Sequence, residues 1–264
     1  MIPISKRVIC ALLLAVLVAG LHLMEAGAAA EAVIGYLPDN QLYRVAIITP
    51  DGDEEYVYQV EYRVEAGRLF ASTIGPGYTM ESRYDADLRL LNSEMAVLTS
   101  EDAVRIGFDR RVAAYDPEEE QYVLVYYLED KLQSTREIRL REQATEIEVL
   151  GLHLQALLNQ GRTDFHGRLL DLNSPGKMQL DSRILTDKQI QDLANQKKMA
   201  PQVRSLLEKR EEIIVFSIGY DGFLRFFFPT RFYVVLENTA PYRILSYWAG
   251  SGERLRFHIY QFLE

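Results

Sequence analysis

The chain has 264 residues, of which 48% are hydrophobic and 25% are charged, and its formal net charge at pH 7 is −9. A chain of this length can bury a sizeable core, and the acidic balance argues against nucleic acid or an anionic lipid surface as a partner. Its single cysteine is Cys10. The chain therefore has no disulfide partner within itself, and the sequence after residue 30 has no thiolate for a metal site.

Residues 1–30 have the layout of a cleaved secretory signal. Lys6 and Arg7 precede an apolar run over residues 8–23, and small residues follow at 28–30. This run is shorter than the roughly 18 to 20 apolar residues that span a bilayer. We therefore expect cleavage near residues 28–30 and a mature protein that is periplasmic or secreted. Retention of the segment as a membrane anchor is the alternative.

Residues 31–264 are expected to form a single β-rich domain, because no charged, proline-rich or low-complexity linker divides them. From residue 42 to 150, short runs of β-branched and aromatic residues alternate with turn sequences such as Pro50-Asp51-Gly52-Asp53, which is typical of an antiparallel meander. The run YVYQVEYRV places Tyr56, Tyr58, Val60, Tyr62 and Val64 on one face. Its period of two predicts a strand with one buried face. The runs VRIGF and TEIEVLG are predicted as further strands.

Two segments have helical patterns. GLHLQALLNQG predicts a short helix that ends at Gly161. A longer segment, at about 186–210, begins with a capping hydroxyl on Thr186 three residues before Gln189, and Pro201 should break or kink it. Four or five strands follow, one of them within 223–229. The predicted fold class is therefore mainly β: a large, curved antiparallel sheet or barrel of meander topology with two or three helices, the main one at about 186–210.

An aromatic-rich stretch over residues 222–250 contains the only tryptophan, and its charged residues exclude a membrane-spanning helix. Alternation predicts one apolar face that includes Phe226, Phe228, Phe232, Ile244 and Trp248. Two interpretations stay open: this face is ordinary core, or it walls an apolar cavity for an amphipathic anion, with arginines at the rim. The candidate ligand-binding residues under the second interpretation are Phe226, Phe228, Phe232, Trp248, Arg225 and Arg231.

Motifs for catalysis are absent from the sequence. It contains no G-x-S-x-G elbow, no H-E-x-x-H and no phosphate-binding loop, and the histidines outside the signal, at positions 153, 166 and 258, are far apart. We therefore expect no catalytic residues, no metal, no cofactor and no enzymatic activity. Acids such as Asp85 and Asp87 leave a carboxylate-dependent glycan hydrolase open as a less favoured alternative. An outer-membrane β-barrel is another.

The mid-chain hairpin DFHGRLLDLNSPGKMQLDSRIL and the closing hairpin FYVVLENTAPYRILSYWAG, placed after a signal and a long meander, give the sequence its characteristic layout. This layout, over roughly residues 40–262, resembles an uncharacterised domain-of-unknown-function family of exported Gram-negative β-barrel proteins. That family is related in fold to lipocalin-like barrels and periplasmic lipoprotein carriers. The resemblance implies a non-enzymatic role in the cell envelope. The helical segment at 186–210 departs from a plain barrel.

Two functions from different classes follow. The first is an exported envelope protein that binds or carries an apolar or lipidic ligand in an aromatic-lined cavity. The second is a structural or interaction protein of the cell envelope with a filled core, whose partner is an envelope protein.

Overall fold

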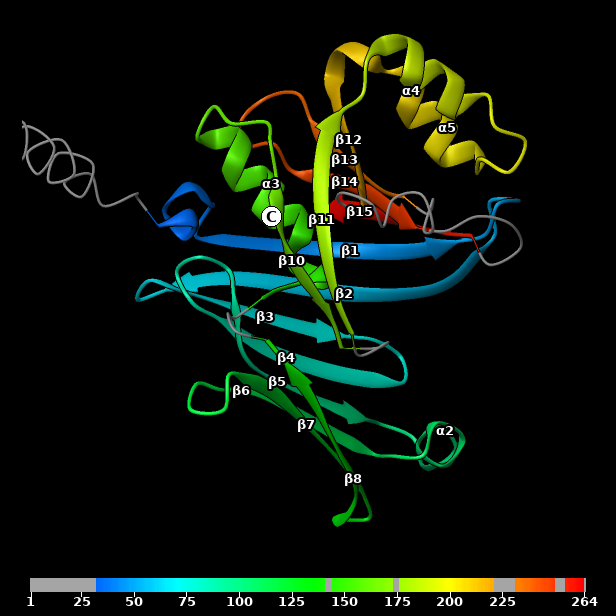
Figure 1. Ribbon diagram of the computed structural model, residues 1–264. Coiled ribbons are helices and arrows are strands. Elements are labelled where there is room, and N and C mark those ends of the chain that lie inside the picture. The colour runs from blue at the N-terminus through cyan, green and yellow to red at the C-terminus, as the bar shows by residue number, and fades with distance from the viewer. Residues whose placement is uncertain (1–31, 141–143, 173–175, 221–230, 250–254, 264) are drawn as a thin grey trace, which may run out of the picture. The chain divides into compact units, whose positions relative to one another are not determined.

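The computed structural model describes residues 32–140, 144–172, 176–220, 231–249 and 255–263. The chain divides into two units, residues 1–32 and 33–264, and the second unit contains every element described below. Within the described residues, fifteen strands form a single sheet (Figure 1). None of the helices in these residues has the length and hydropathy of a membrane span.

The strands are β1 (Asn40–Ile48), β2 (Glu54–Glu65), β3 (Arg68–Ile74), β4 (Tyr78–Tyr84), β5 (Leu90–Val97), β6 (Arg110–Asp116), β7 (Gln121–Leu128), β8 (Lys131–Arg139), β9 (Thr145–Glu146), β10 (His166–Asp171), β11 (Gly176–Ile184), β12 (Ile213–Tyr220), β13 (Phe232–Glu237), β14 (Ile244–Ala249) and β15 (Arg256–Phe262). The α-helices are α2 (Ser100–Ile106), α3 (Leu150–Asn159), α4 (Asp187–Ala194) and α5 (Pro201–Glu208). Three short 3-10 turns are η1 (Val33–Tyr36), η2 (Ile147–Val149) and η3 (Arg210–Glu212).

The sheet consists of two meanders joined side by side. Strands β1 to β8 pair with one another in sequence order, and strands β10 to β15 do the same. The last strand, β15, also pairs with β1 and so joins the two meanders into one sheet. All of these pairs are antiparallel, whereas β9 pairs with β10 in parallel. The prediction of a mainly β fold with a large meander sheet is confirmed, although the sheet is mixed because of this one pair.

The sheet curls back on itself without closing. Leu90 N–H donates to the carbonyl of Ala144, just before β9, at 3.1 Å, although β5 and β9 are far apart in the strand order. Arg111 Nη1 on β6 donates to the carbonyl of Leu172, just after β10, at 3.0 Å. The outermost strands β8 and β9 do not pair with each other, so the described residues form an open sheet, not a closed barrel.

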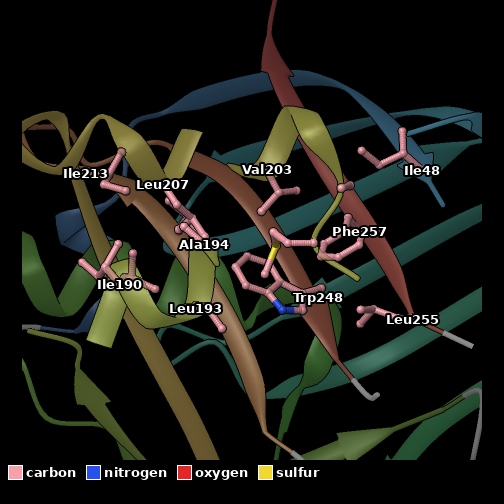
Figure 2. Close-up of a cluster of buried hydrophobic side chains, with 14 of the residues drawn as sticks. Ile48, Ile190, Leu193, Ala194, Val203, Leu207, Ile213, Trp248, Leu255 and Phe257 are labelled. Atoms are coloured by element: carbon pink, nitrogen blue, oxygen red, sulfur yellow. The ribbon is translucent and has the colours of Figure 1, made fainter. Parts of the chain in front are cut away.

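One face of the sheet, here called the α4–α5 face, is covered by those two helices (Figure 2). Their apolar side chains, among them Ile190, Leu193, Val203 and Leu207, pack on strands β12 to β15 and β1. Burial of such side chains contributes roughly 1.5 to 3 kcal/mol each. Packing of their apolar side chains on the sheet therefore stabilises the two helices.

The opposite face, here called the α3 face, holds the short helix that the sequence predicts before Gly161. The helix is apolar on nearly every side because most of its surface is covered by protein. Seven of its ten residues are buried: Leu150, Leu152, Leu154, Gln155, Ala156, Leu157 and Leu158. Gly151 allows close packing on β14, because a Cβ at this position would lie 2.6 Å from Ile244 Cδ1.

Three sequence predictions about helices need correction. The run VRIGF was predicted as a strand, but its first three residues belong to α2, which Thr99 caps by accepting from Asp102 N–H and which Gly107 ends in a left-handed conformation. The run TEIEVLG forms only a two-residue strand before η2 and α3. The described residues therefore contain four α-helices instead of two or three. The break predicted at Pro201 is confirmed, since α4 and α5 are separate helices.

The predicted grouping of aromatic residues on one face is also wrong. Tyr233 lies directly opposite Trp248 across the β13–β14 pair, so Phe232, its neighbour in the chain, faces the other way. A register shift between Val235 and Leu236 pairs Leu236 with Ile244. This β-bulge turns Ile244 towards α3, away from the face that holds Trp248.

Candidate functional site

The structure places each sequence-predicted ligand residue in a definite setting or leaves it outside the described residues. Arg225, Phe226 and Phe228 lie in the segment 221–230, outside the described residues. Trp248, Phe232 and Arg231 are described, and they do not come together.

Trp248 belongs to the packed core of the α4–α5 face. It is 2% exposed, and its ring stacks on Tyr233 with centroids 5.1 Å apart and contacts Phe257 at 5.6 Å. Figure 2 shows the indole beneath α4 and α5, surrounded by aliphatic side chains. This setting is core packing, so Trp248 does not line a ligand cavity.

Arg231 is tied to the same face. Its Nη1 donates to Ser217 Oγ at 3.1 Å, and Ser217 pairs with Tyr233 across β12 and β13. Phe232 is half-buried on the opposite face. The predicted combination of Phe232, Trp248 and Arg231 around one cavity is therefore wrong, because alternation along β13 separates the aromatic residues.

A second aromatic set lies on the α3 face, and of its members only Tyr56 and Tyr58 are predicted by the sequence to lie on a buried face. The registers of four adjacent strands align Tyr56, Ile47, His258 and Tyr247 in one row across β2, β1, β15 and β14. Tyr58 follows on the same face of β2. We call Tyr56, Tyr58, Tyr78, Tyr247 and His258 the tyrosine surface.

Contacts between the rings hold the tyrosine surface together. The hydroxyl of Tyr58 lies 3.2 Å from His258 Nδ1, and the rings of Tyr247 and His258 are 4.4 Å apart. Tyr56 stacks on Tyr78 of β4, with centroids at 6.4 Å and planes at 10°. Offset ring pairs of this kind add about 0.5–1.5 kcal/mol beyond area burial. The surface is therefore a connected aromatic layer with members on β2, β4, β14 and β15, and not a set of isolated rings.

Burial controls the protonation of this surface. It lowers the pKa of His258 to about 4, so the imidazole is neutral at physiological pH. Burial, followed by the charge of Glu148 in η2, raises the pKa of Tyr58 well above its usual value of 10. Tyr78 changes in the same direction for the same two reasons. The phenols of Tyr58 and Tyr78 therefore keep their protons and can donate hydrogen bonds.

The tyrosine surface is partly open. Tyr58 is buried, whereas Tyr56, Tyr78, Tyr247 and His258 are half-buried. His258 in particular keeps accessible surface although the protein around it is dense enough to lower its pKa.

Next to this surface the interior is filled. η2 lies over β2, where Tyr62 Oη donates to the carbonyl of Glu148 at 3.4 Å. Between η2, α3 and strands β13 to β15, the remaining void is about 10 Å³, which is the space of roughly one water molecule. A bulky ligand therefore has no room under α3, and the half-buried rings beyond it are the accessible part.

Other polar groups in the interior serve the fold. Glu146 is 1% exposed and accepts from Tyr84 Oη at 2.6 Å, which ties β9 to β4. Asp85, one of the acids considered for hydrolysis, accepts from the backbone N–H groups of Asp87 and Arg89 and so stabilises a turn. Among the described residues, no three side chains of His, Cys, Asp or Glu meet in a way that could hold a metal ion.

Comparisons with known proteins give matches only among solved structures. No protein-family model matches the chain, and no curated protein matches it. The chain is similar to the crystal structure of a β-barrel-like protein of domain of unknown function DUF1849 from Brucella abortus, with a TM-score of 0.44 and 8% identity over 85% of this chain and 95% of that chain. A second match, to DNA polymerase III subunit beta from Borrelia burgdorferi, has a TM-score of 0.16 and 8% identity over 90% of this chain and 62% of that one.

The first match agrees with the resemblance predicted from the sequence, to a domain-of-unknown-function family of β-barrel proteins. At 8% identity neither match assigns a residue or an activity to this chain.

Proposed function

We propose that this protein is exported to the cell envelope and acts there, without enzymatic activity, as a binding module for an apolar or lipidic ligand. The ligand would lie against the tyrosine surface of the α3 face. The observation that supports this proposal is the half-buried state of Tyr56, Tyr78, Tyr247 and His258, in an interior where the neighbouring rings are buried.

The chemistry of these residues suits an amphipathic molecule. Ring faces remove apolar surface from water, and protonated phenol groups donate hydrogen bonds to a polar head. The location differs from that expected from the sequence, because Trp248 and Arg231 lie on the other face of the sheet. The candidate ligand residues are therefore tyrosines and His258.

The alternative, a structural or interaction protein of the envelope with a filled core, has an observation in its favour. The α4–α5 face is packed around Trp248, and only about 10 Å³ remains open between α3 and β13 to β15. If the tyrosine surface takes no ligand, this function is the better account.

Titration with a fluorescent long-chain fatty acid tests the proposal. Tyr78→Ala and Tyr247→Ala should each weaken binding about tenfold or more, the effect of losing one buried ring contact worth roughly 1.5 to 3 kcal/mol. Tyr127→Ala is the matched control, because Tyr127 pairs with Arg110 on β6, with the guanidinium 4.4 Å from its ring, and lies on the opposite face of the sheet.

Wild-type protein that takes up no fatty acid, together with protein from its own host that carries no lipid in native mass spectrometry, would overturn the proposal. Equal binding by the variants and the wild type would place the ligand elsewhere.

A further inference from the structure

A groove separate from the tyrosine surface lies on the α4–α5 face, where the end of α5 meets the ends of β13 and β14. Its volume is about 360 Å³, within the range of roughly 300–1,000 Å³ that is usual for ligand sites. Its lining residues all lie in the described part of the chain: Leu206, Lys209, Glu211, Glu212, Ile213, Glu237, Thr239 and Leu245.

The floor of the groove is apolar. Ile213 is 4% exposed, and Leu206 and Leu245 are only partly buried against the core. Leu245 faces this side because of the β-bulge, which leaves it between Ile244, turned towards α3, and Ser246, paired with Val235. The floor therefore presents apolar carbon atoms that the protein's own helices do not fully cover.

The rim of the groove is acidic. It has three glutamates against one lysine, and Lys209 Nζ lies 3.9 Å from Glu212 Oε2. Within the described residues, the carboxylates of Glu211 and Glu237 take part in no ion pair. The backbone carbonyl of Glu211 accepts from Asn238 Nδ2 at 3.1 Å, which fixes the position of this residue at the rim. The groove therefore keeps a local excess of two negative charges.

We propose that this groove docks a basic, amphipathic segment of a partner protein. An arginine or lysine of that segment would lay its aliphatic stem on Leu206 and Leu245 and place its cationic head between Glu211 and Glu237. Charge complementarity selects the partner, since the rim is acidic and the whole chain has a net charge of −9. This inference does not depend on a ligand at the tyrosine surface.

Synthetic peptides test the proposal on the full protein. The probe is a fluorescent twelve-residue peptide of alternating leucine and arginine, and its two controls replace every arginine by glutamate or every leucine by serine. Fluorescence anisotropy at low and at higher salt gives the affinities. The variant Glu211→Gln/Glu237→Gln is compared with Glu118→Gln/Glu119→Gln, a matched pair of exposed acids in the turn between β6 and β7.

The leucine–arginine peptide should bind the wild type and the Glu118/Glu119 control equally. It should bind the Glu211/Glu237 variant about tenfold more weakly, and the difference should shrink as salt screens the charges. Both control peptides should bind more weakly than the probe. The proposal is overturned if the two double variants bind alike, if the glutamate or serine peptide binds as tightly as the probe, or if spermidine occupies the groove while the peptide does not.

Discussion

Trp248 shows what one side chain contributes to this fold. Its indole is 2% exposed and packs against Tyr233, Phe257 and the two helices above it. Because truncation would leave a large cavity that the surrounding strands cannot close, Trp248→Ala should lower the free energy of unfolding by about 3 to 5 kcal/mol. Urea titration of the variant measures this loss.

Phe232→Ala is the control for that prediction, because Phe232 is half-buried on the opposite face and should cost less. A Trp248→Ala protein as stable as the wild type would contradict the assignment of Trp248 to the core.

His258 makes stability depend on pH. Burial lowers its pKa from the ordinary 6.5 to about 4. Above pH 6.5 the imidazole is neutral in both folded and unfolded chains and has no effect. Between pH 6.5 and 4 the unfolded chain binds a proton that the folded chain does not, so stability is lost as pH falls. From pH 7 to 5 this loss should be about 2 kcal/mol.

Chemical denaturation at pH 7 and pH 5 tests this dependence. His258→Asn should remove that part of the loss. His166→Asn, at an exposed histidine of β10, is the matched control substitution. His153, whose pKa is also about 4 through burial and the nearby charge of Arg162, adds a similar dependence that both variants retain. An equal pH dependence in the His258 variant and the wild type would contradict the burial of His258.

At the scale of one element, α3 depends on a single close approach. A Cβ at position 151 would meet Ile244 Cδ1 at 2.6 Å and Cγ1 at 3.0 Å. Gly151→Ala should therefore destabilise the protein by about 1 kcal/mol or more, because overpacking outweighs the gain in helix propensity. Adding Ile244→Val, which deletes Cδ1, should recover part of the loss. Thermal unfolding of the single and double variants measures both effects, and a more stable Gly151→Ala protein would contradict the packing of α3 on β14.

Elements with a strong local signal are those that the sequence predicts correctly. Thr186 and Gln189 form the capping box expected at the start of α4. Pro201 is the first residue of α5, a position where the missing backbone N–H of proline costs no hydrogen bond within the helix. The helix α2 was missed because Val104 and Ile106 suggest a strand, whereas the cap from Thr99 is the signal that could have identified it.

The site was the harder prediction because faces depend on register. Alternation within β2 correctly places Tyr56 and Tyr58 on one face. Alternation does not, however, determine which face of the sheet the side chains of the next strand occupy after a turn. The β-bulge in β13–β14 also places Ile244 and Trp248 on opposite faces, where simple alternation predicts the same face. The tyrosine surface needs four strands in register, and such long-range pairing is invisible in a single sequence. A hint was available in the composition, where 16 tyrosines outnumber 11 phenylalanines.

At the scale of the whole molecule, the two meanders meet at the β1–β15 pair, so the N-terminal and C-terminal strands of the sheet lie side by side at its centre. Tyr43 of β1 packs edge-on against Tyr260 of β15, with ring centroids 5.6 Å apart. Because β15 follows β8 by more than a hundred residues, the pair that joins the two meanders can form only long after the strands of the first meander are present.

The proposed export makes the beginning of the mature protein a decisive observation. Residues 8–23 form the apolar run of the predicted signal, and the small residues at 28–30 are its predicted cleavage site. Expressed in a Gram-negative host, the protein should therefore start near Ala29 or Glu31 and be recovered from the periplasm or the medium. N-terminal sequencing and intact mass measurement determine this start. Replacing Ala28 and Ala30 by arginine should block cleavage and leave the precursor membrane-bound. If wild-type protein retains Met1 and stays in the membrane fraction, the N-terminal segment is a membrane anchor. The proposed binding at the tyrosine surface would then belong to a membrane-anchored protein.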